Sequence, residues 1–309
     1  LRKDPRTMSE YFDLQVNGYG GVDFNSDDLT AEDFGKSLAA LRRDGVEQFL
    51  PTIITDTIEA MCGRLRRLTE LREQIPLAKE IIAGLHVEGP FLNENDGYRG
   101  AHPRDAIHQA NVAEMQKLLD AANGLVKLVT LAPERDADFR TIDFLSRSGV
   151  RISAGHTDAS LDELKGAIDH GLSIFTHVGN GCPMQMHRHD NIIQRALTLA
   201  DRLYLTFIAD GTHVPLFVLK NYLSIANVDR CMVVTDAIAP AGFGPGRYKF
   251  ARWELLIEDD LVAWAPDRSH FVGSAITMRQ SEANLRKIGL SAECCVKLTQ
   301  TNPRRAMGI

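Results

Sequence analysis

The sequence predicts an α/β fold, a (β/α)8 barrel, and three observations support this. Eight short apolar runs follow one another along the chain, separated by helical or loop-rich segments, and this alternation is typical of a parallel sheet with outer helices. The chain has 309 residues, a length at which eight such units favour a closed barrel over an open doubly wound sheet. Most of the runs also end in a residue that can bind a metal or move a proton, as barrel strands do at an active-site face.

The apolar runs predict eight strands, at residues 11–16, 48–53, 81–87, 125–131, 150–154, 172–176, 203–208 and 231–235. Apolar residues at helical spacing predict helices near 30–43, 58–71, 106–121 and 139–145. Ser160 and Glu163 have the spacing of a capping box.

The alternation breaks after Asp236. We expect an inserted hairpin at about 246–272, with strands at 248–253 and 255–264, and then helices at 276–288 and 292–299. The predicted organisation is an N-terminal tail, residues 1–10, and one barrel domain, residues 11–309.

Composition limits the possible partners and compartment. The formal net charge is −6 and no basic run stands out, so no nucleic-acid partner is expected. No apolar segment approaches the roughly 18 residues of a membrane span, so no membrane partner is expected either. The five cysteines show no C-x-x-C pairing or disulfide-like spacing, which favours a reducing, cytoplasmic compartment.

Residues with reactive side chains gather at the ends of the predicted strands. An isolated histidine or glutamate at such a place is often structural, for example a buried glutamate in an ion pair near a turn. The recurrence on successive strands favours a common site at the mouth of the barrel. The residues concerned are Gln15, Asn17, Glu88, His156, His177, His213 and Asp236, with His102 on the loop after Glu88.

Two imidazoles and one carboxylate form a common zinc-binding set that leaves a position open for water. Asp236 has the chemistry of a base that takes a proton from such a water.

The ordered set of motifs resembles the N-acetylglucosamine-6-phosphate deacetylases of the amidohydrolase superfamily, from about Phe12 to the end of the chain. The matching stretches are Asp13-Leu-Gln-Val-Asn-Gly18, His86-Val-Glu-Gly-Pro-Phe-Leu92, Gly155-His156-Thr157, Thr176-His177, Asp210-Gly-Thr-His213, Val234-Thr-Asp-Ala237, Gly273-Ser-Ala-Ile-Thr-Met278 and Asn302-Pro303. The resemblance implies a metal-dependent amidohydrolase barrel that hydrolyses the acetamide of N-acetylglucosamine 6-phosphate, or a close amino-sugar phosphate, to the amino sugar and acetate.

The resemblance also implies a role for each matching residue. Glu88, His156 and His177 would hold one divalent metal ion, with zinc the first expectation and iron, cobalt or manganese as alternatives. Asp236 would be the catalytic acid and base, and His102 would polarise the acetamide carbonyl. Many amidohydrolases have H-x-H on the first strand and bind a second metal; here the amides Gln15 and Asn17 stand there, so one metal is expected. The implied substrate-binding residues are Asn180, Gly181, Arg188, His213, Gln15 and Asn17.

The family's arginine that corresponds to Arg188 and its histidine that corresponds to His213 reach the substrate's phosphate from a neighbouring subunit, so the resemblance implies a homodimer with sites completed in trans. Two departures stand beside this. His187 and His189 flank Arg188 unusually; they either extend an anion site or are exposed loop residues. The family's small β-domain is largely absent, so the chain is either a minimal barrel or part of a longer protein.

Two other functions compete with an amino-sugar deacetylase. One is a different amidohydrolase, such as a cyclic-amide hydrolase or deaminase, although those usually keep H-x-H on the first strand. The other is a catalytically silent barrel that only binds a sugar phosphate. The presence of Asp236 together with all three metal ligands argues against the silent barrel.

Overall fold

The computed structural model describes residues 10–250, 252–259, 261–268 and 270–309. The predicted N-terminal tail, residues 1–10, therefore lies outside the described residues except for Glu10. Within the described ranges no helix is long and apolar enough to cross a membrane.

Eight parallel strands form one sheet, which confirms the predicted barrel. Each strand pairs with the next one along the chain, and β10 reaches β1 through a parallel bridge between Val16 and Ala237. The Asn17 amide donates to the Ala237 carbonyl oxygen at 2.7 Å at this seam, so the sheet curves back on itself. The strands are β1 (Tyr11–Val16), β4 (Val46–Ile54), β5 (Leu85–Glu88), β6 (Val126–Leu131), β7 (Arg151–Ala154), β8 (Ile174–Phe175), β9 (Tyr204–Ile208) and β10 (Cys231–Val234).

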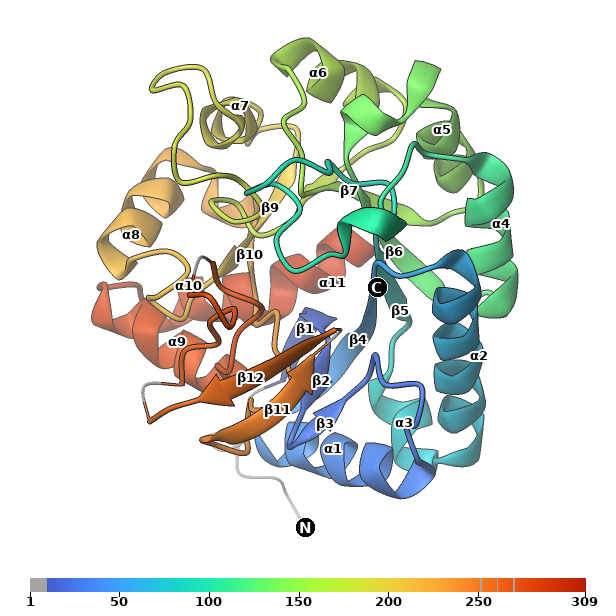
Figure 1. Ribbon diagram of the computed structural model, residues 1–309. Helices are drawn as coiled ribbons and strands as arrows, with labels where there is room; N and C mark the ends of the chain where they lie inside the picture. The colour runs from blue at the N-terminus through green and yellow to red at the C-terminus, as the bar shows by residue number, and fades with distance from the viewer. Residues whose placement is uncertain (1–9, 251, 260, 269) are drawn as a thin grey trace.

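Helices surround the strands (Figure 1). Their apolar faces pack on the outer side of the sheet in one large buried cluster, so each strand is covered on both faces. That double burial explains why the strands appear in the sequence as nearly continuous apolar runs. The helices are α1 (Ala31–Arg43), α2 (Ile58–Gln74), α3 (Pro76–Ile81), α4 (Val112–Ala121), α5 (Arg140–Arg147), α6 (Leu161–Asp169), α7 (Ile192–Thr198), α8 (Leu216–Ile225), α9 (Met278–Lys287), α10 (Ala292–Val296) and α11 (Asn302–Met307).

A second apolar cluster fills the inside of the barrel. It consists of Phe12, Leu14, Leu50, Leu128, Ile174, Ile208, Met232 and Val234, and Ala306 of α11 packs against it. A polar layer borders this cluster: His86 Nε2 lies 2.8 Å from Thr130 Oγ1, and burial lowers the pKa of His86 to about 4. The ring is therefore neutral and serves as a hydrogen-bonding core residue.

The segment after β10 leaves the alternating pattern, as expected. β11 (Gly246–Phe250) and β12 (Trp253–Ile257) pair antiparallel, and both lie earlier than the predicted strands. In Figure 1 this hairpin is drawn in front of β1. A second small antiparallel pair, β2 (Gly18–Tyr19) and β3 (Val22–Asp23), follows β1. Phe250, Leu255 and Ile257 of the hairpin are buried in one small cluster with Ile54, the last residue of β4, and Ile238, on the segment after β10.

Two predicted helices are wrong in extent. The helix predicted at 106–121 begins only at Val112, because Asn111 accepts hydrogen bonds from the Ala113 and Glu114 amides and so caps it there. The helix predicted at 292–299 ends at Val296, and a π-helical turn, η5 (Lys297–Thr301), leads into α11. The Ser160–Glu163 capping box at the start of α6 is confirmed.

Candidate active site

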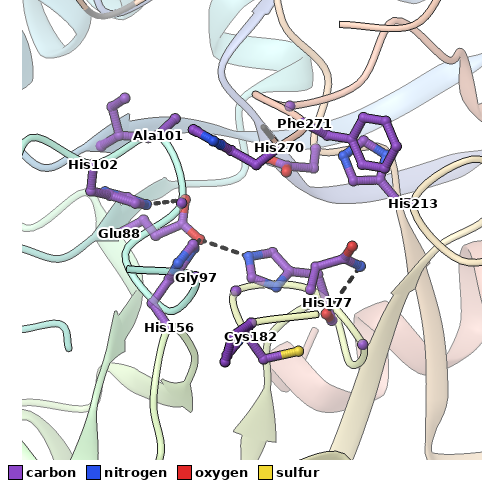
Figure 2. Close-up of a pocket in the computed structure, with 18 of the residues that line it drawn as sticks. Glu88, Gly97, Ala101, His102, His156, His177, Cys182, His213, His270 and Phe271 are labelled. Carbon is purple, nitrogen blue, oxygen red and sulfur yellow. Dashed lines mark hydrogen bonds and ion pairs between the residues drawn. The ribbon is translucent and has the colours of Figure 1, made fainter. Parts of the chain in front are cut away.

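Glu88 ends β5 and lies where two histidine rings converge. Its Oε1 atom is 3.2 Å from His177 Nε2 and 3.4 Å from His156 Nε2 (Figure 2). One ligand atom from each of the three residues lies within 4.8 Å of the others, and all three residues are buried. Two imidazole nitrogens and a carboxylate in this arrangement can hold one divalent metal ion.

The hydrogen bonding of His156 suits a metal ligand. Its Nδ1 atom lies 2.6 Å from the carbonyl oxygen of Tyr98, and since a carbonyl only accepts, the ring must donate from Nδ1. The other nitrogen, Nε2, faces Glu88. Burial alone would lower the pKa of His156, but the hydrogen bond and charge of Glu88 outweigh it and raise that pKa, so Nε2 carries a proton that a metal ion would displace. Burial alone would raise the pKa of Glu88, but the contacts with His156 and His177 outweigh it and hold that pKa well below its ordinary value.

Asp236 follows β10 and lines the same cavity, whose volume is about 380 Å³. Its Oδ1 atom accepts a hydrogen bond from Asn17 Nδ2 at 2.7 Å. Burial, and then the negative charge of Glu88, raise the pKa of Asp236 to about 6. A carboxylate with a pKa close to neutral can both take up and release a proton.

His102 lies on the loop after β5, buried beside the cluster, with Nε2 3.9 Å from Glu88 Oε2. Burial, followed by the proximity of His156, lowers the pKa of His102 to about 3, so its ring is neutral. Its Nδ1 atom is 2.8 Å from Thr55 Oγ1. The Thr55 hydroxyl donates its one hydrogen to the Glu88 carbonyl oxygen at 3.2 Å, so Thr55 Oγ1 accepts from His102 Nδ1. The single proton of the neutral ring then sits on Nδ1, and Nε2, the atom nearer to Glu88, presents its lone pair.

Three residues at this face have left-handed backbone conformations. His156, His177 and Asp236 have φ angles of 51°, 34° and 50°. Such conformations cost about 1–3 kcal/mol each for residues other than glycine and persist where the surrounding structure enforces them. They concentrate here at the points where β7, β8 and β10 turn into their loops.

Comparison with known proteins gives the family. The chain is 30% identical over 312 residues to the N-acetylglucosamine-6-phosphate deacetylase of Bos taurus, which covers 97% of this chain and 74% of that protein. It is 27% identical over 301 residues to the N-acetylgalactosamine-6-phosphate deacetylase of Escherichia coli O157:H7, with 97% of this chain and 77% of that protein covered. The chain belongs to the N-acetylglucosamine-6-phosphate deacetylase family. No family model matches the sequence.

A solved structure agrees with this assignment. The D267A mutant of the Mycobacterium smegmatis N-acetyl-D-glucosamine-6-phosphate deacetylase, in complex with N-acetyl-D-glucosamine-6-phosphate, superimposes with a TM-score of 0.88 at 27% identity, over 98% of this chain and 78% of that one. The resemblance described from the motifs is confirmed at the level of family and fold.

The other residues that the family resemblance singled out fall into two groups. Asn17, Asn180, Gly181 and His213 line the cavity together with the metal-binding cluster. Gly181 has a φ of 58°, and a Cβ atom there would lie 2.9 Å from His156 Nδ1, so a side chain at this position would press on a metal ligand. His213 is fixed by Asp210, whose Oδ2 lies 2.6 Å from His213 Nδ1.

Gln15 and Arg188 are not among the described residues that line the cavity. Gln15 is buried behind Glu88, and its Nε2 donates to Glu88 Oε1 at 3.0 Å. Arg188 is exposed on the loop between β8 and α7, as are His187 and His189. The structure therefore separates the predicted phosphate-binding arginine from the cavity of its own subunit.

Several residues of the site were missed from the sequence. The segment after β12 forms part of the cavity wall through Trp264, His270 and Phe271. The centroids of the Trp264 and Phe271 rings are 4.3 Å apart. Phe271 also lies 4.9 Å from the His213 ring (Figure 2). The break in alternation after Asp236 was the available signal, because an insertion at this point of a barrel lies next to the active-site face. Thr55 and the Tyr98 carbonyl had no signal in the sequence.

Proposed function

We propose that this chain is a metal-dependent deacetylase that hydrolyses the acetamide of N-acetylglucosamine 6-phosphate, or of a close amino-sugar phosphate, to the amino sugar and acetate. The observation that supports this most directly is the convergence of Glu88, His156 and His177 on one point of a cavity that Asp236 and His102 also line. In a chain of this family, that set contains a metal-binding site, a base and a hydrogen-bond donor.

One divalent ion would be held by Glu88, His156 and His177, with zinc the first choice and iron, cobalt or manganese also suited to such a set. When bound, the ion supplies an easily deprotonated water and a Lewis acid for the acetamide carbonyl. Gln15 steadies the carboxylate of Glu88 through its hydrogen bond to Oε1 and keeps it turned toward the histidines.

Asp236 would take the proton of the attacking water and later return it, because it lines the cavity beside Glu88, His156 and His177 and Asn17 holds its carboxylate in place. His102 would polarise the carbonyl oxygen from Nε2 in the form of the ring that carries a proton on that nitrogen, and a donor at this place is worth roughly 3–4 kcal/mol as negative charge develops. Asp236 then delivers its proton to the sugar nitrogen as the carbon–nitrogen bond breaks. One hydrogen of the water reaches the nitrogen through Asp236, and its oxygen and other hydrogen leave in acetic acid. The acid then gives its proton to the amine, so the products are acetate and the protonated amine.

The sugar would lie between the cluster and the wall formed by Trp264 and Phe271. Asn17, Asn180 and Gly181 are placed to contact its polar groups. None of the described residues that line the cavity is a lysine or an arginine, so the wall offers no permanent positive charge for a phosphate.

We propose that a second copy of the chain supplies this charge through Arg188 and that the working form is a homodimer. The β8–α7 loop supports this, since Arg188 is exposed and Met184, at the rim of the cavity in the same loop, has 98% of its surface exposed. An exposed methionine suits a protein contact, because a flexible thioether packs well on varied surfaces. The five free cysteines support a cytoplasmic location.

Acetate release tests the proposal. Zinc-loaded protein is incubated with N-acetylglucosamine 6-phosphate, N-acetylgalactosamine 6-phosphate and the two unphosphorylated sugars. We expect acetate from a phosphorylated sugar, at a rate abolished in Glu88→Ala, which loses the metal. Failure to release acetate from any of the four sugars, at full metal loading, would overturn the proposed function.

A further inference from the structure

Thr235, the residue between β10 and Asp236, is tied to β1 through both of its polar donors. Its backbone amide donates to Asp13 Oδ1 at 3.2 Å, and its hydroxyl donates to Asp13 Oδ2 at 2.6 Å. The same hydroxyl oxygen accepts a hydrogen bond from the Ala237 amide at 3.2 Å. Asp13 and Thr235 are each only 1% exposed, so these contacts are shielded from water.

Ser274 holds the same segment from the opposite side. Its hydroxyl donates to the Thr235 carbonyl oxygen at 2.5 Å, and its backbone amide donates to the Asp236 carbonyl oxygen at 3.0 Å. The preceding residue, Gly273, has a φ of 79°, and a Cβ atom there would lie 2.6 Å from a side-chain carbon of Ile238. Glycine at 273 is therefore what lets Ser274 approach Asp236 this closely.

Asp236 itself has the left-handed conformation, which is unfavourable for an aspartate unless its neighbours enforce it. Asp13 accepts two hydrogen bonds from Thr235, the residue before Asp236, and Ser274 donates to the carbonyl oxygens of Thr235 and Asp236. The Thr235 hydroxyl also holds the amide of Ala237, the residue after Asp236. If the chain relaxed, the carboxylate would turn away from Asn17, which contacts it at 2.7 Å.

We infer that Asp13 and Ser274 form a clamp on Thr235 and Asp236 and act as positioning residues that aim the Asp236 carboxylate into the cavity. This inference rests on the proposed function, since it concerns the base of that reaction. It explains two motif residues, Asp13 and Ser274, that neither bind the metal nor line the cavity.

Two variants test the clamp with the full-length, metal-loaded protein. Ser274→Ala removes one hydroxyl donor, and Thr235→Val removes the other hydroxyl with little change of shape. We expect kcat to fall about 10- to 100-fold in both variants, the range expected when a catalytic group is misplaced by about 1 Å. KM and metal content should stay within about two-fold of wild type, since neither side chain contacts the metal ligands or lines the cavity.

Ser281→Ala is the matched control. Ser281 is a fully buried serine of α9, and its hydroxyl has no hydrogen-bond partner among the described residues. Its removal should leave kcat unchanged. A crystal structure of Ser274→Ala gives a readout independent of activity: we expect the Asn17–Asp236 contact to lengthen beyond hydrogen-bonding distance.

The outcomes separate the clamp from a general structural role. Wild-type kcat per bound metal ion in Ser274→Ala, or an Asp236 side chain unmoved in its crystal structure, would overturn the inference even if the variant were less stable. Inactive wild-type protein would overturn the proposed function, whereas active wild type with unaffected variants would overturn only the clamp. If Thr235→Val does not fold, the kinetics and structure of Ser274→Ala decide the question.

Discussion

Gln15 donates a hydrogen bond to Glu88, with 3.0 Å between its Nε2 and the carboxylate Oε1. Two positions later Asn17 makes the corresponding contact with Asp236, at 2.7 Å. Each amide of the first strand thus holds one of the two carboxylates of the site. Because an amide nitrogen donates and does not bind metals well, Gln15 and Asn17 orient these carboxylates and are poor candidates to hold a second ion.

We therefore expect close to one divalent ion per chain. His177→Ala should lose this ion, because it removes one of only three protein ligands, and Glu88→Ala should do the same. Metal analysis of purified protein after dialysis measures this, with His187→Ala as a control that removes an exposed histidine away from the cluster. Two tightly bound ions per chain would contradict the single-site interpretation.

Asp236→Asn should retain metal and substrate binding but lose turnover by at least about three orders of magnitude. The amide has the same shape but cannot take up and return a proton. Steady-state kinetics together with a binding titration would show the effect as a loss of kcat without a matching rise in the dissociation constant. Near-normal kcat in this variant would mean that Asp236 is a structural residue at the end of its strand.

Thr55→Val should lower kcat by about ten-fold or more. Valine removes the hydroxyl oxygen that accepts from His102 Nδ1 and that also donates to the Glu88 carbonyl oxygen, so it removes the contact that fixes the orientation and tautomer of the ring. Thr55→Ser, which keeps the hydroxyl, is the matched control and should restore most of the rate. If both variants were equally slow, lost packing and not the tautomer would be the cause.

The sequence was sufficient for the barrel and for the reactive residues at its strand ends. Apolar runs buried on both faces are local signals, and the residue that ends each run, such as Glu88 or Asp236, is thereby placed at one face of the sheet. Local hydrogen bonding also allowed the capping box at Ser160 to be predicted.

The contacts that orient those residues could not be predicted in the same way. Thr55 meets His102 across 47 positions of the chain, and Tyr98 meets His156 across 58, so only the closed fold brings them together. The predicted bounds of the hairpin were wrong because only one face of β12 is buried. Trp253 and Ile257 alternate along the strand with exposed residues, and this pattern does not mark clearly where the strand begins and ends. The placement of Gln15 behind Glu88, instead of in the cavity, depends on the closed sheet, in which its side chain reaches Glu88 of β5 although β4 lies between β1 and β5, and it has no sequence signature.

Arg188→Ala should raise KM strongly for a phosphorylated substrate and only slightly for its unphosphorylated analogue. The guanidinium is always charged and can bind a phosphate through two parallel hydrogen bonds, whereas the described cavity wall has no such group. A mixture of inactive Asp236→Asn chains with Arg188→Ala chains should regain activity on the phosphorylated sugar if Arg188 acts in trans. Equal losses on both substrates, or a fully active monomer in sedimentation, would count against the dimer.

The stability of the protein should fall between about pH 4 and pH 7 because of Asp13. Burial raises the pKa of Asp13 from 3.8 to about 7, so in this range the folded chain holds a proton that the unfolded chain has released. Raising the pH therefore favours unfolding, by at most about 1.4 kcal/mol per pH unit from this group, and above pH 7 the contribution becomes constant. Asp13→Asn, which resembles the protonated acid, should remove the Asp13 share of this dependence, whereas burial also raises the pKa of Asp23 to about 7 and that share stays. Urea unfolding of metal-free wild type and variant at pH 5 and pH 8 measures this effect. The free energy of unfolding of the variant should rise relative to that of wild type at pH 8. If the difference between the two proteins were the same at both pH values, the Asp13 carboxyl would be ionised throughout.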